Sequence, residues 1–388
     1  MWTNIGRIIQ SDKKPCLYLL ERQMPFRKWD ALIFLYCIHV ILMYSHAGAQ
    51  SHAIIDNNFL KVEGIPNISI NAIAQDGDGY IWIGTSKGLY KYDGYQYVGY
   101  KNIFNDSTSI SDNGVRSLFV DSKGVLWVGT TSLNRYNRSC DCFTIFSDVR
   151  AVRSFAEDAD HNLWVGTNSG GLLMYDKKTE RFTRFLNNTS DSISLVNDQI
   201  NTLLFDRDGL LWIGTGDPFT ESDIHAHGLL SFDPASRNVR QYVSSNSNQN
   251  GLKDNRVTAL LEDTHGQLLI GSSQSGLHYY DVEDDVIVQI EANPDQPEQL
   301  HAPIGNSKLT PTPFVQILYE DNDGGFWVGT FSEGLNYFDP SGTRYNYHAN
   351  DTSATSTFTN SFVWAFLEDQ QGHIWVGNRA EGLYRYNP

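Results

Sequence analysis

A short sequence segment occurs seven times in this chain of 388 residues, and this repetition restricts the fold more than any other feature. Every copy begins with Asp. A Gly follows three residues later in all copies but the third, and a Trp follows six residues later in all copies but the fifth. Val or Ile, then Gly and usually Thr, come directly after the Trp position. The copies begin at Asp76, Asp121, Asp158, Asp206, Asp263, Asp321 and Asp369.

Each copy predicts four antiparallel strands joined by short turns. Asp-x-x-Gly is typical of a hairpin turn, because Asp caps its own backbone and Gly accepts a positive φ. An apolar strand such as 115–120 precedes the turn and the Trp strand follows it; Gly-Leu-x-x-aromatic predicts the third strand, and an aromatic stretch such as 182–185 the fourth. The copies lie 37 to 58 residues apart, which is close to the period of a propeller blade. The sequence therefore predicts an all-β, seven-bladed β-propeller of four-stranded antiparallel blades.

The two ends of the repeat array predict how the ring closes. The last copy ends at Pro388 after its third strand, whereas a strand-like segment, 58–62, precedes the first copy without a blade of its own. We expect this N-terminal strand to complete the last blade, which removes an exposed sheet edge. We also expect the Gly after each Trp to permit a close approach of neighbouring backbones, and the Trp to fill the space between adjacent blades.

Residues 1–49 have the pattern of a cleavable signal peptide. Arg27 and Lys28 precede an apolar run over 31–44, and the run ends in an A-x-A site at 47–49. The run is short for a membrane span, so an uncleaved anchor is the second interpretation. We expect Met24 to be the true translation start, with residues 1–23 a misassigned extension. We expect export to the periplasm, with 50–388 forming the propeller and the propeller itself making no membrane contact.

The composition disfavours several classes of partner. The formal net charge is −16, and the first 49 residues contribute more basic than acidic side chains. An exported chain this acidic is poorly suited to nucleic acid or anionic membranes. Only Cys140 and Cys142 follow the leader, and they could form a local disulfide in an oxidising compartment. A lone Cys-x-Cys is weak support for a metal, so neither a metal nor a cofactor is expected.

Departures from the repeat are the candidate binding positions, because the fold alone does not require them. The largest is the insertion over 216–227 in the fourth copy, between its second and third strands, on the face where propellers commonly bind ligands. It has three interpretations, which are, in order, a plain surface loop, a ligand contact and a metal site. A second insertion, 291–313, should lie on the same face. The polar residues of the first insertion are Asp217, Glu221, Asp223, His225 and His227.

Other loops between second and third strands supply further polar side chains to that face. Trp364, which lies outside the repeat motif, either stacks on a sugar ring or belongs to the core. Acidic pairs such as Asp76 and Asp78 are interpreted as turn structure and not as calcium ligands, because they recur with the hairpin. The remaining candidate ligand-binding residues are Lys87, Asn168, Gln274, Glu333, Arg379 and Glu381.

The repeat resembles that of the two-component regulator propeller family, whose pattern is Asp-x-x-Gly, Leu-Trp-Val/Ile-Gly-Thr and Gly-Leu-x-Arg-Tyr-Asp. Copies one and seven match it well over 82–93 and 375–386, and the resemblance covers roughly 59–388. It implies the extracytoplasmic sensor of a hybrid histidine kinase, and many such sensors detect oligosaccharides. The usual architecture adds a second propeller, an immunoglobulin-like domain, a membrane helix and a kinase core, whereas this sequence contains no kinase motif.

Three functions remain open from the sequence. The first is a non-catalytic sensor that binds an oligosaccharide or another small ligand, as a sensor fragment or a solitary protein; a second propeller, an immunoglobulin-like domain or a second copy of this chain are its expected protein partners. The second is a propeller enzyme (lyase, lactonase or glycosidase) with a polar or metal cluster at the axis, although no nucleophile elbow or ordered Ser/His/Asp set is present. The third is a protein-interaction platform.

Overall fold

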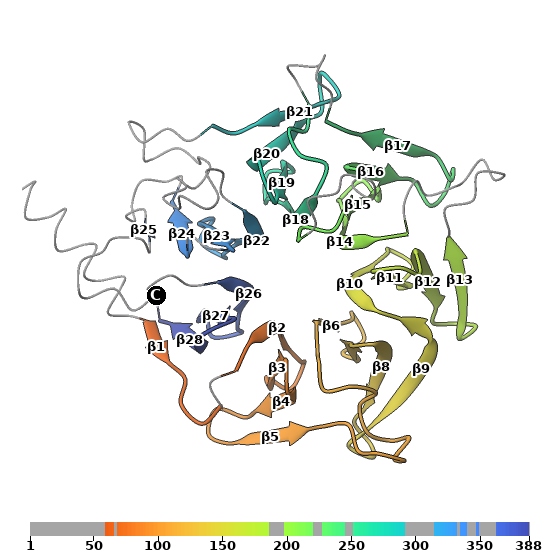
Figure 1. Ribbon diagram of the computed structural model, residues 1–388, viewed down its shortest axis with the longest axis vertical. Coiled ribbons are helices and arrows are strands. Elements are labelled where there is room, and N and C mark those ends of the chain that lie inside the picture. Colours follow the sequence, from red (N-terminus) through yellow and green to blue (C-terminus); the bar gives the residue numbers. More distant parts are fainter. Residues whose placement is uncertain are drawn as a thin grey trace, which may run out of the picture. The chain divides into compact units, whose positions relative to one another are not determined.

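The computed structural model describes residues 59–65, 68–185, 198–219, 227–244, 251–291, 314–331, 334–339, 347–348 and 362–387. They form seven four-stranded antiparallel sheets, arranged as blades around a central axis (Figure 1). The predicted all-β, seven-bladed propeller is confirmed. The expected signal peptide, 1–49, and most of the second insertion, 292–313, lie outside the described residues.

In six of the blades the strands follow one another from the axis to the rim in chain order. Blade one contains β2 (Ile70–Gln75), β3 (Ile81–Thr85), β4 (Gly88–Tyr92) and β5 (Tyr97–Tyr100). Blade two contains β6 (Ser117–Val120), β7 (Leu126–Gly129), β8 (Ser132–Asn137) and β9 (Cys142–Arg150). Blade three contains β10 (Val152–Glu157), β11 (Leu163–Thr167), β12 (Leu172–Asp176) and β13 (Arg181–Phe185). Blade four contains β14 (Ile200–Phe205), β15 (Leu211–Thr215), β16 (Leu229–Phe232) and β17 (Val239–Tyr242).

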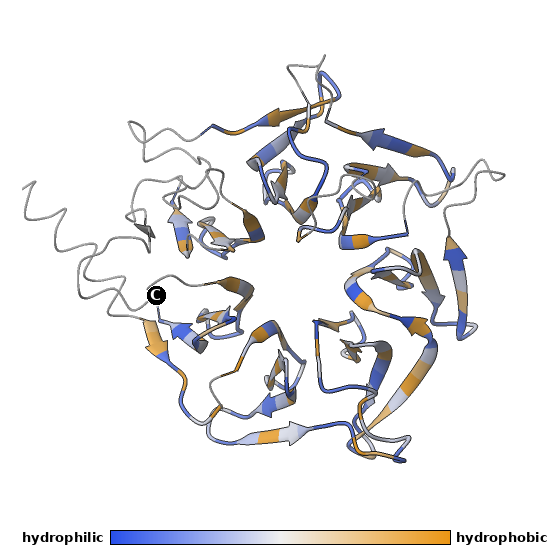
Figure 2. Cartoon of the chain, in the orientation of Figure 1, coloured by the Kyte–Doolittle hydropathy of each residue, from blue (hydrophilic) through white to orange (hydrophobic). Residues whose placement is uncertain are grey.

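The remaining three blades repeat this order. Blade five contains β18 (Val257–Glu262), β19 (Leu268–Ser272), β20 (Gly276–Asp281) and β21 (Val286–Gln289). Blade six contains β22 (Val315–Glu320), β23 (Phe326–Thr330), β24 (Leu335–Phe338) and β25 (Tyr347–His348). Blade seven contains β26 (Val363–Glu368), β27 (Ile374–Asn378), β28 (Gly382–Tyr386) and, as its outer strand, β1 (Phe59–Lys61). Hydrophobic residues concentrate in the inner strands, whereas β13 and β17 at the rim are largely hydrophilic (Figure 2).

The ring closes through its first strand, as the sequence predicts. β1 pairs antiparallel with β28, and Phe59 lies opposite Tyr386 with 4.8 Å between their ring centroids. A second link joins the first and last blades near their turns, where the backbone N–H of Gln370 donates to Oε1 of Gln75 at 2.8 Å. The N-terminal strand therefore covers the sheet edge that β28 would otherwise expose.

The aspartate that opens each repeat caps its turn and also anchors the Trp six residues later. In blade one, Oδ1 of Asp76 accepts the N–H groups of Asp78 and Tyr80, and Oδ2 accepts the indole N–H of Trp82 at 2.9 Å. All six copies that have a Trp contain the same indole bond, at 2.7–2.9 Å. The turn glycine has a positive φ in its six copies, and His161 adopts φ 67° in the third. The repeated carboxylates thus bond within their own turns, and Asp76 and Asp121 also pair with a basic side chain of the next blade.

Each glycine that follows a Trp allows the next blade to approach closely, as expected. A Cβ placed on Gly84 would lie 2.6 Å from Cγ1 of Val115 in blade two, and every blade repeats this contact. Trp82 packs in one buried cluster with Leu126 and Val128 of blade two. The repeat therefore encodes the joints between blades as well as the strands. Its buried β-branched partners are Ile70, Val115, Val152, Ile200, Val257, Val315 and Val363.

Two smaller points complete the fold. Cys140 and Cys142 form a disulfide within the turn between β8 and β9. Among the residues that the structure describes, no helix has the length and apolar character that crossing a membrane requires.

Candidate ligand-binding site

The inner strands share an irregularity that brings one residue of every blade to the axis. In six blades the pairing between the first and second strands shifts by one residue near the start of the inner strand, so that one residue is left unpaired. In blade two the equivalent residue, Arg116, directly precedes β6. Such bulges redirect a side chain and are frequent beside functional sites. We call these residues the bulge ring: Asn71, Arg116, Arg153, Asn201, Thr258, Gln316 and Trp364.

Packing explains why the side chain at this position can vary. The residue before each bulge is the fully buried Ile or Val that contacts the glycine of the preceding blade. The residue after it pairs with the glycine of its own blade, as Ala72 does with Gly84. Both neighbours are therefore restricted by close packing, whereas the bulge residue faces the channel. This is where the repeat can change without loss of the fold.

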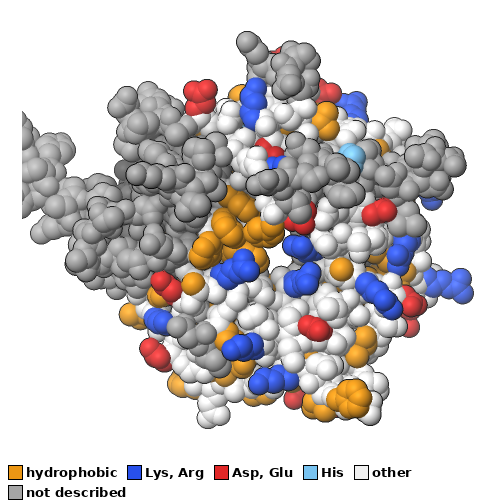
Figure 3. Space-filling model, viewed as in Figure 1, with side chains coloured by type: hydrophobic (Ala, Val, Ile, Leu, Met, Phe, Trp, Pro, Cys, Tyr) orange, Lys and Arg blue, Asp and Glu red, His pale blue; other side chains and the backbone are white. Residues whose placement is uncertain are grey.

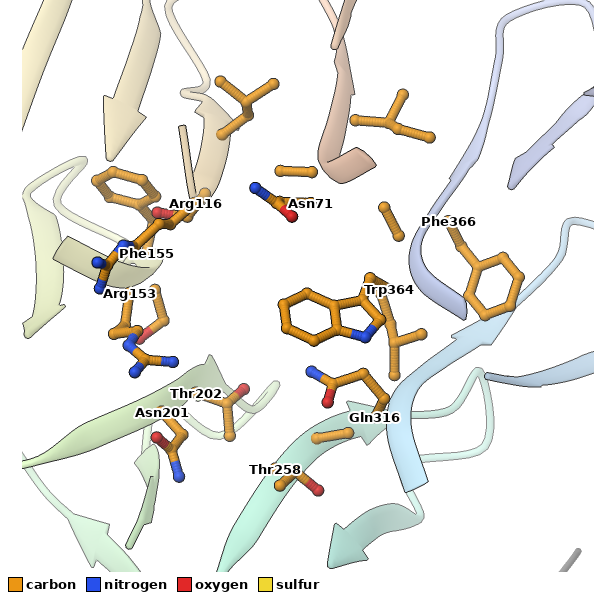
Figure 4. A pocket seen from close by; sticks show the side chains of 18 of the residues that line it. Asn71, Arg116, Arg153, Phe155, Asn201, Thr202, Thr258, Gln316, Trp364 and Phe366 are labelled. Atoms are coloured by element: carbon orange, nitrogen blue, oxygen red, sulfur yellow. The ribbon is translucent and has the colours of Figure 1, made fainter. Parts of the chain in front are cut away.

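The bulge ring surrounds a cavity of about 980 Å³ at the mouth of the central channel. All seven of its residues line the cavity, together with Pro218, Phe219 and Arg379 from loops on the same face. Figure 4 shows the two guanidinium groups on one side of the opening and the Trp364 indole between Asn71 and Gln316. On the surface, Lys and Arg side chains lie next to a hydrophobic patch around the middle of this face (Figure 3).

Three members of the ring also brace neighbouring blades. Nδ2 of Asn71 donates to the carbonyl of Val115 at 2.7 Å, and Nδ2 of Asn201 donates to the carbonyl of Val257 at 3.1 Å. The hydroxyl of Thr258 donates to the carbonyl of Val315 in blade six. These short polar side chains thus bond to a backbone carbonyl of the next blade. Their structural contribution is clear from these bonds.

Other polar atoms of the ring make no such bond. Nε of Arg153, Oε1 of Gln316 and Nε1 of Trp364 are buried, and none of them has a hydrogen-bond partner within the described part of the chain. A buried polar atom without a partner costs roughly 1–3 kcal/mol. The residues that carry these atoms all line the cavity, so the atoms are placed where a bound ligand can accept from or donate to them.

Electrostatics distinguish one side of the cavity. Burial lowers the pKa of Arg153, the neighbouring charge of Arg116 lowers it further, and Asp217 acts in the opposite direction. The two arginines occupy equivalent positions on adjacent blades, so their positive charges are held on the same wall. This wall is cationic although the chain as a whole is acidic.

Aromatic rings form the other side. Phe219, in the blade-four loop, stacks on Trp364 of blade seven with 6.3 Å between centroids, and its ring lies 5.5 Å from that of Phe331 in blade six. The blade-four loop therefore reaches past blade five across the face. The guanidinium of Arg379 lies 4.7 Å from the centre of the Trp364 ring. The result is an aromatic surface next to guanidinium and amide groups, a combination that suits ring-shaped polar ligands.

The structure brings some of the sequence candidates together. Trp364 and Arg379 line the cavity, and Trp364 lies on its wall outside the interior clusters. Asp217 is near enough to Arg153 to influence its pKa and directly precedes Pro218 of the lining. His227 is described, and its N–H donates to the Thr215 hydroxyl at the base of the loop.

Other candidates do not line the cavity. The backbone N–H of Lys87 donates to a Thr hydroxyl, and the side chain of Asn168 accepts from Gln199. The backbone N–H of Gln274 donates to Asp254, while the carboxylate of Glu381 accepts from Tyr384. Within the described ranges, no group of three His, Cys, Asp or Glu side chains is placed to hold a metal ion. Glu221, Asp223, His225 and Glu333 lie outside the described residues.

Most residues of the bulge ring were not among the binding residues predicted from the sequence. That prediction included Trp364 but none of Asn71, Arg116, Arg153 or Gln316. A signal was present, because every ring residue stands five positions before the aspartate of its repeat. That position contains Asn, Arg, Arg, Asn, Thr, Gln and Trp in the seven copies, whereas the position before it is always Ile or Val.

Comparisons with known proteins agree with the predicted repeat and with the propeller fold. The family model described as two component regulator propeller matches residues 64–87, 109–132, 147–169, 194–217, 309–332 and 357–380. A protein named histidine kinase P4 from Formosa agariphila is 25% identical over 308 residues, which are 76% of this chain and 21% of the kinase. The chain thus spans about a fifth of that relative's length.

Solved structures share the fold. The extracellular domain assigned to the hybrid two component system BT3049 of B. thetaiotaomicron matches with a TM-score of 0.67 and 22% identity, over 85% of this chain and 41% of that one. The corresponding domain of BT4673 from the same organism matches with 0.64 and 24%, over 85% and 40%. A streptogramin B lyase matches with a TM-score of 0.58 and 13% identity, over 86% of this chain and 99% of that one. At these identities the likeness concerns the fold.

Proposed function

This chain belongs to the two component regulator propeller family, and on that premise we propose that its ring is an extracellular sensor that binds a small ligand at the mouth of the central channel. The named relatives support this context, since one is a histidine kinase and two are extracellular domains of hybrid two component systems. The proposed location is the periplasmic side of the cell envelope, which agrees with the signal-peptide pattern of 1–49.

One observation carries the proposal. The seven copies keep nearly the same Asp, Trp, Gly and buried β-branched residue, yet they differ at the bulge position, which lines the cavity in every blade. A purely structural ring would not need seven side chains of such different chemistry at its axis. Chemically different side chains on a concave surface are what selective binding requires.

The chemistry of the cavity favours an oligosaccharide. Its volume of about 980 Å³ lies at the upper end of typical small-ligand pockets, roughly 300–1,000 Å³. Trp364 and Phe219 offer flat apolar faces, and Asn71, Gln316 and Arg153 offer donors and acceptors around them. Sugars present the same combination of apolar ring faces and outward hydroxyls.

Binding without catalysis is part of this proposal. The described side chains that line the cavity are amides, hydroxyls, guanidinium groups and hydrophobic groups. None of them readily exchanges a proton near neutral pH, as general acid–base catalysis requires. The lyase likeness concerns the fold, so the enzyme interpretation stays second. Mass spectrometry of oligosaccharides after incubation with the chain tests it, because cleaved products would contradict a purely binding role.

The ring is proposed to act together with further domains. It spans about two fifths of the extracellular domains that it resembles, so a second propeller or an immunoglobulin-like domain of the same sensor is the proposed partner. Ligand binding would then shift the equilibrium between arrangements of these domains, and the activity of a kinase domain would respond to that shift.

Calorimetry with a panel of oligosaccharides tests the proposed binding. We expect at least one to bind, and Trp364→Ala to weaken its binding roughly 10-fold or more, since an aromatic side chain contributes a large buried area and a loss of about 1.4 kcal/mol corresponds to a factor of ten. Tyr95→Ala is the matched control, because Tyr95 is an exposed aromatic residue that does not line the cavity. If no oligosaccharide binds, or if both variants behave alike, the proposal is wrong.

A further inference from the structure

We propose that the ligand of this site is an acidic oligosaccharide, and that Arg116 and Arg153 together bind one of its oxyanions, a carboxylate or a sulfate. The inference rests on the proposed function and specifies its ligand class. It starts from the placement of two cationic side chains, at equivalent positions of adjacent blades, on one wall of the cavity (Figure 4).

The electrostatic repulsion between Arg116 and Arg153 in the absence of a ligand is the first argument. The charges of Arg116 and Arg153 are close enough for one to disfavour the charged form of the other, and Arg153 is also half-buried. Like charges in a partly desolvated site repel each other more strongly than in water. An anion between the two groups would relieve this repulsion.

Donor geometry is the second argument. A guanidinium presents a planar fork of N–H donors that matches the two oxygens of a carboxylate or sulfate. Nε of Arg153 is buried and has no hydrogen-bond partner among the described residues, so at least one donor of this fork is available. Neutral hydroxyl groups would satisfy the donor but would leave the paired charges uncompensated.

The charge balance of the lining is the third argument. Besides Arg116 and Arg153, the described lining includes Arg379, whose guanidinium lies over the Trp364 ring. Asp217 is the carboxylate that favours the charged form of Arg153, and it offsets one of the two positive charges on this wall. Counted over the described residues of this wall, one positive charge therefore remains for a ligand, in a chain whose formal net charge is −16.

The opposite wall explains why a saccharide, and not a free anion, is proposed. Trp364 extends into the opening from the side opposite the arginines (Figure 4), and together with Phe219, which stacks on it, provides an apolar surface that a small inorganic anion would not use. A sugar ring with a charged substituent can stack on one wall while its oxyanion reaches the other. The two walls thus recognise two parts of one molecule.

Calorimetry with matched probes tests the inference. The probes are an oligogalacturonate, the same oligosaccharide with its carboxylates reduced to alcohols, a sulfated neutral oligosaccharide and sodium sulfate alone. We expect an acidic saccharide to bind roughly 10-fold or more tightly than the reduced one, because hydrogen bonds to charged groups contribute about 1.5–3 kcal/mol. Its affinity should also fall as salt is added. The carboxylate and sulfate probes show which oxyanion the site prefers.

Variants separate this inference from the proposed function. Arg116→Gln and Arg153→Gln should each remove most of the preference for the acidic probe, and Arg153→Lys should restore part of it. Arg181→Gln is the matched control, since Arg181 is exposed on the outer strand β13. If the reduced oligosaccharide binds as well as the acidic one and binding depends on Trp364 alone, the sensor proposal stands and the inference is wrong.

Two further outcomes also decide the question. Binding of sodium sulfate alone, with no added affinity from a saccharide, would contradict the role of the aromatic wall and so the inference. If no saccharide of either class binds, both the proposed function and this inference are wrong. Melting temperatures of all variants verify that each remains folded.

Discussion

Gly377 of the last blade lies directly against Ile70 of the first. A Cβ on Gly377 would come within 2.7 Å of Cγ2 of Ile70 and within 3.0 Å of Cβ of Ala365 in its own blade. The same contact between a glycine and a β-branched residue joins every other pair of neighbouring blades. At this joint it connects residues more than 300 positions apart in the sequence, so it reports on closure of the whole ring.

Gly377→Ala is therefore expected to destabilise the ring by about 1–3 kcal/mol, because an added methyl group has no room in a packed joint. Urea denaturation followed by tryptophan fluorescence measures this free energy of unfolding. Gly77→Ala is the control, since a Cβ at Gly77 would meet nothing within 4 Å. Equal stability of the two variants would show that the joint is looser than the structure indicates.

Lys177 connects blades two and three near their turns. Its Nζ lies 2.9 Å from Oδ2 of Asp121 and 2.7 Å from Oε1 of Glu157, and its side chain is only 10% exposed. Lys177→Met leaves two buried carboxylates without their cation, so we expect a loss of about 3 kcal/mol of unfolding free energy. The exposed neighbour Lys178 is the control, and Lys178→Met should change the stability by less than about 0.5 kcal/mol. Similar losses in both variants would contradict the bridging role.

The same cluster predicts how stability depends on pH. Burial alone would raise the pKa of Asp121 and of Glu157, but hydrogen bonds from Lys177 and other donors outweigh it and keep both pKa values below their ordinary ones. Carboxyls with a lowered folded-state pKa add stability above their unfolded values, near pH 4, and this stability is lost as the pH falls through the folded values. Denaturation curves should therefore show a larger gap between wild type and Lys177→Met at pH 7 than at pH 3. A gap that does not change with pH would argue against this electrostatic origin.

The contact between Phe219 and Trp364 predicts an optical effect. Phe219 covers one face of the Trp364 ring from the blade-four loop, so Phe219→Ala should make this Trp more accessible to acrylamide. Stern–Volmer quenching of the fluorescence measures this change. In a Trp364→Phe background the same substitution should have no effect on quenching. An increase that persists in that background would mean that other tryptophans respond.

The sequence alone was sufficient for the fold, because the interactions that build a blade are local. The aspartate, the turn glycine and the tryptophan of one repeat lie within six residues and bond to each other, as Asp76 and Trp82 do. Seven such units at a blade-like period leave little choice of architecture. The closing strand at Phe59–Lys61 was also predictable, because the last repeat lacks a fourth strand and an unpaired one precedes the first.

The cavity was decided by tertiary structure. Arg116, Arg153 and Trp364 belong to different repeats, and only closure of the ring places their side chains around one opening. The bulge that turns Arg153 and Trp364 toward the axis arises from pairing between strands, and no single repeat displays it as a motif. The reach of Phe219 from blade four to Trp364 of blade seven likewise depends on the path of a loop through space. Contacts within one repeat can be predicted from the sequence, whereas a cavity lined by seven blades forms only when the blades pack together in the ring.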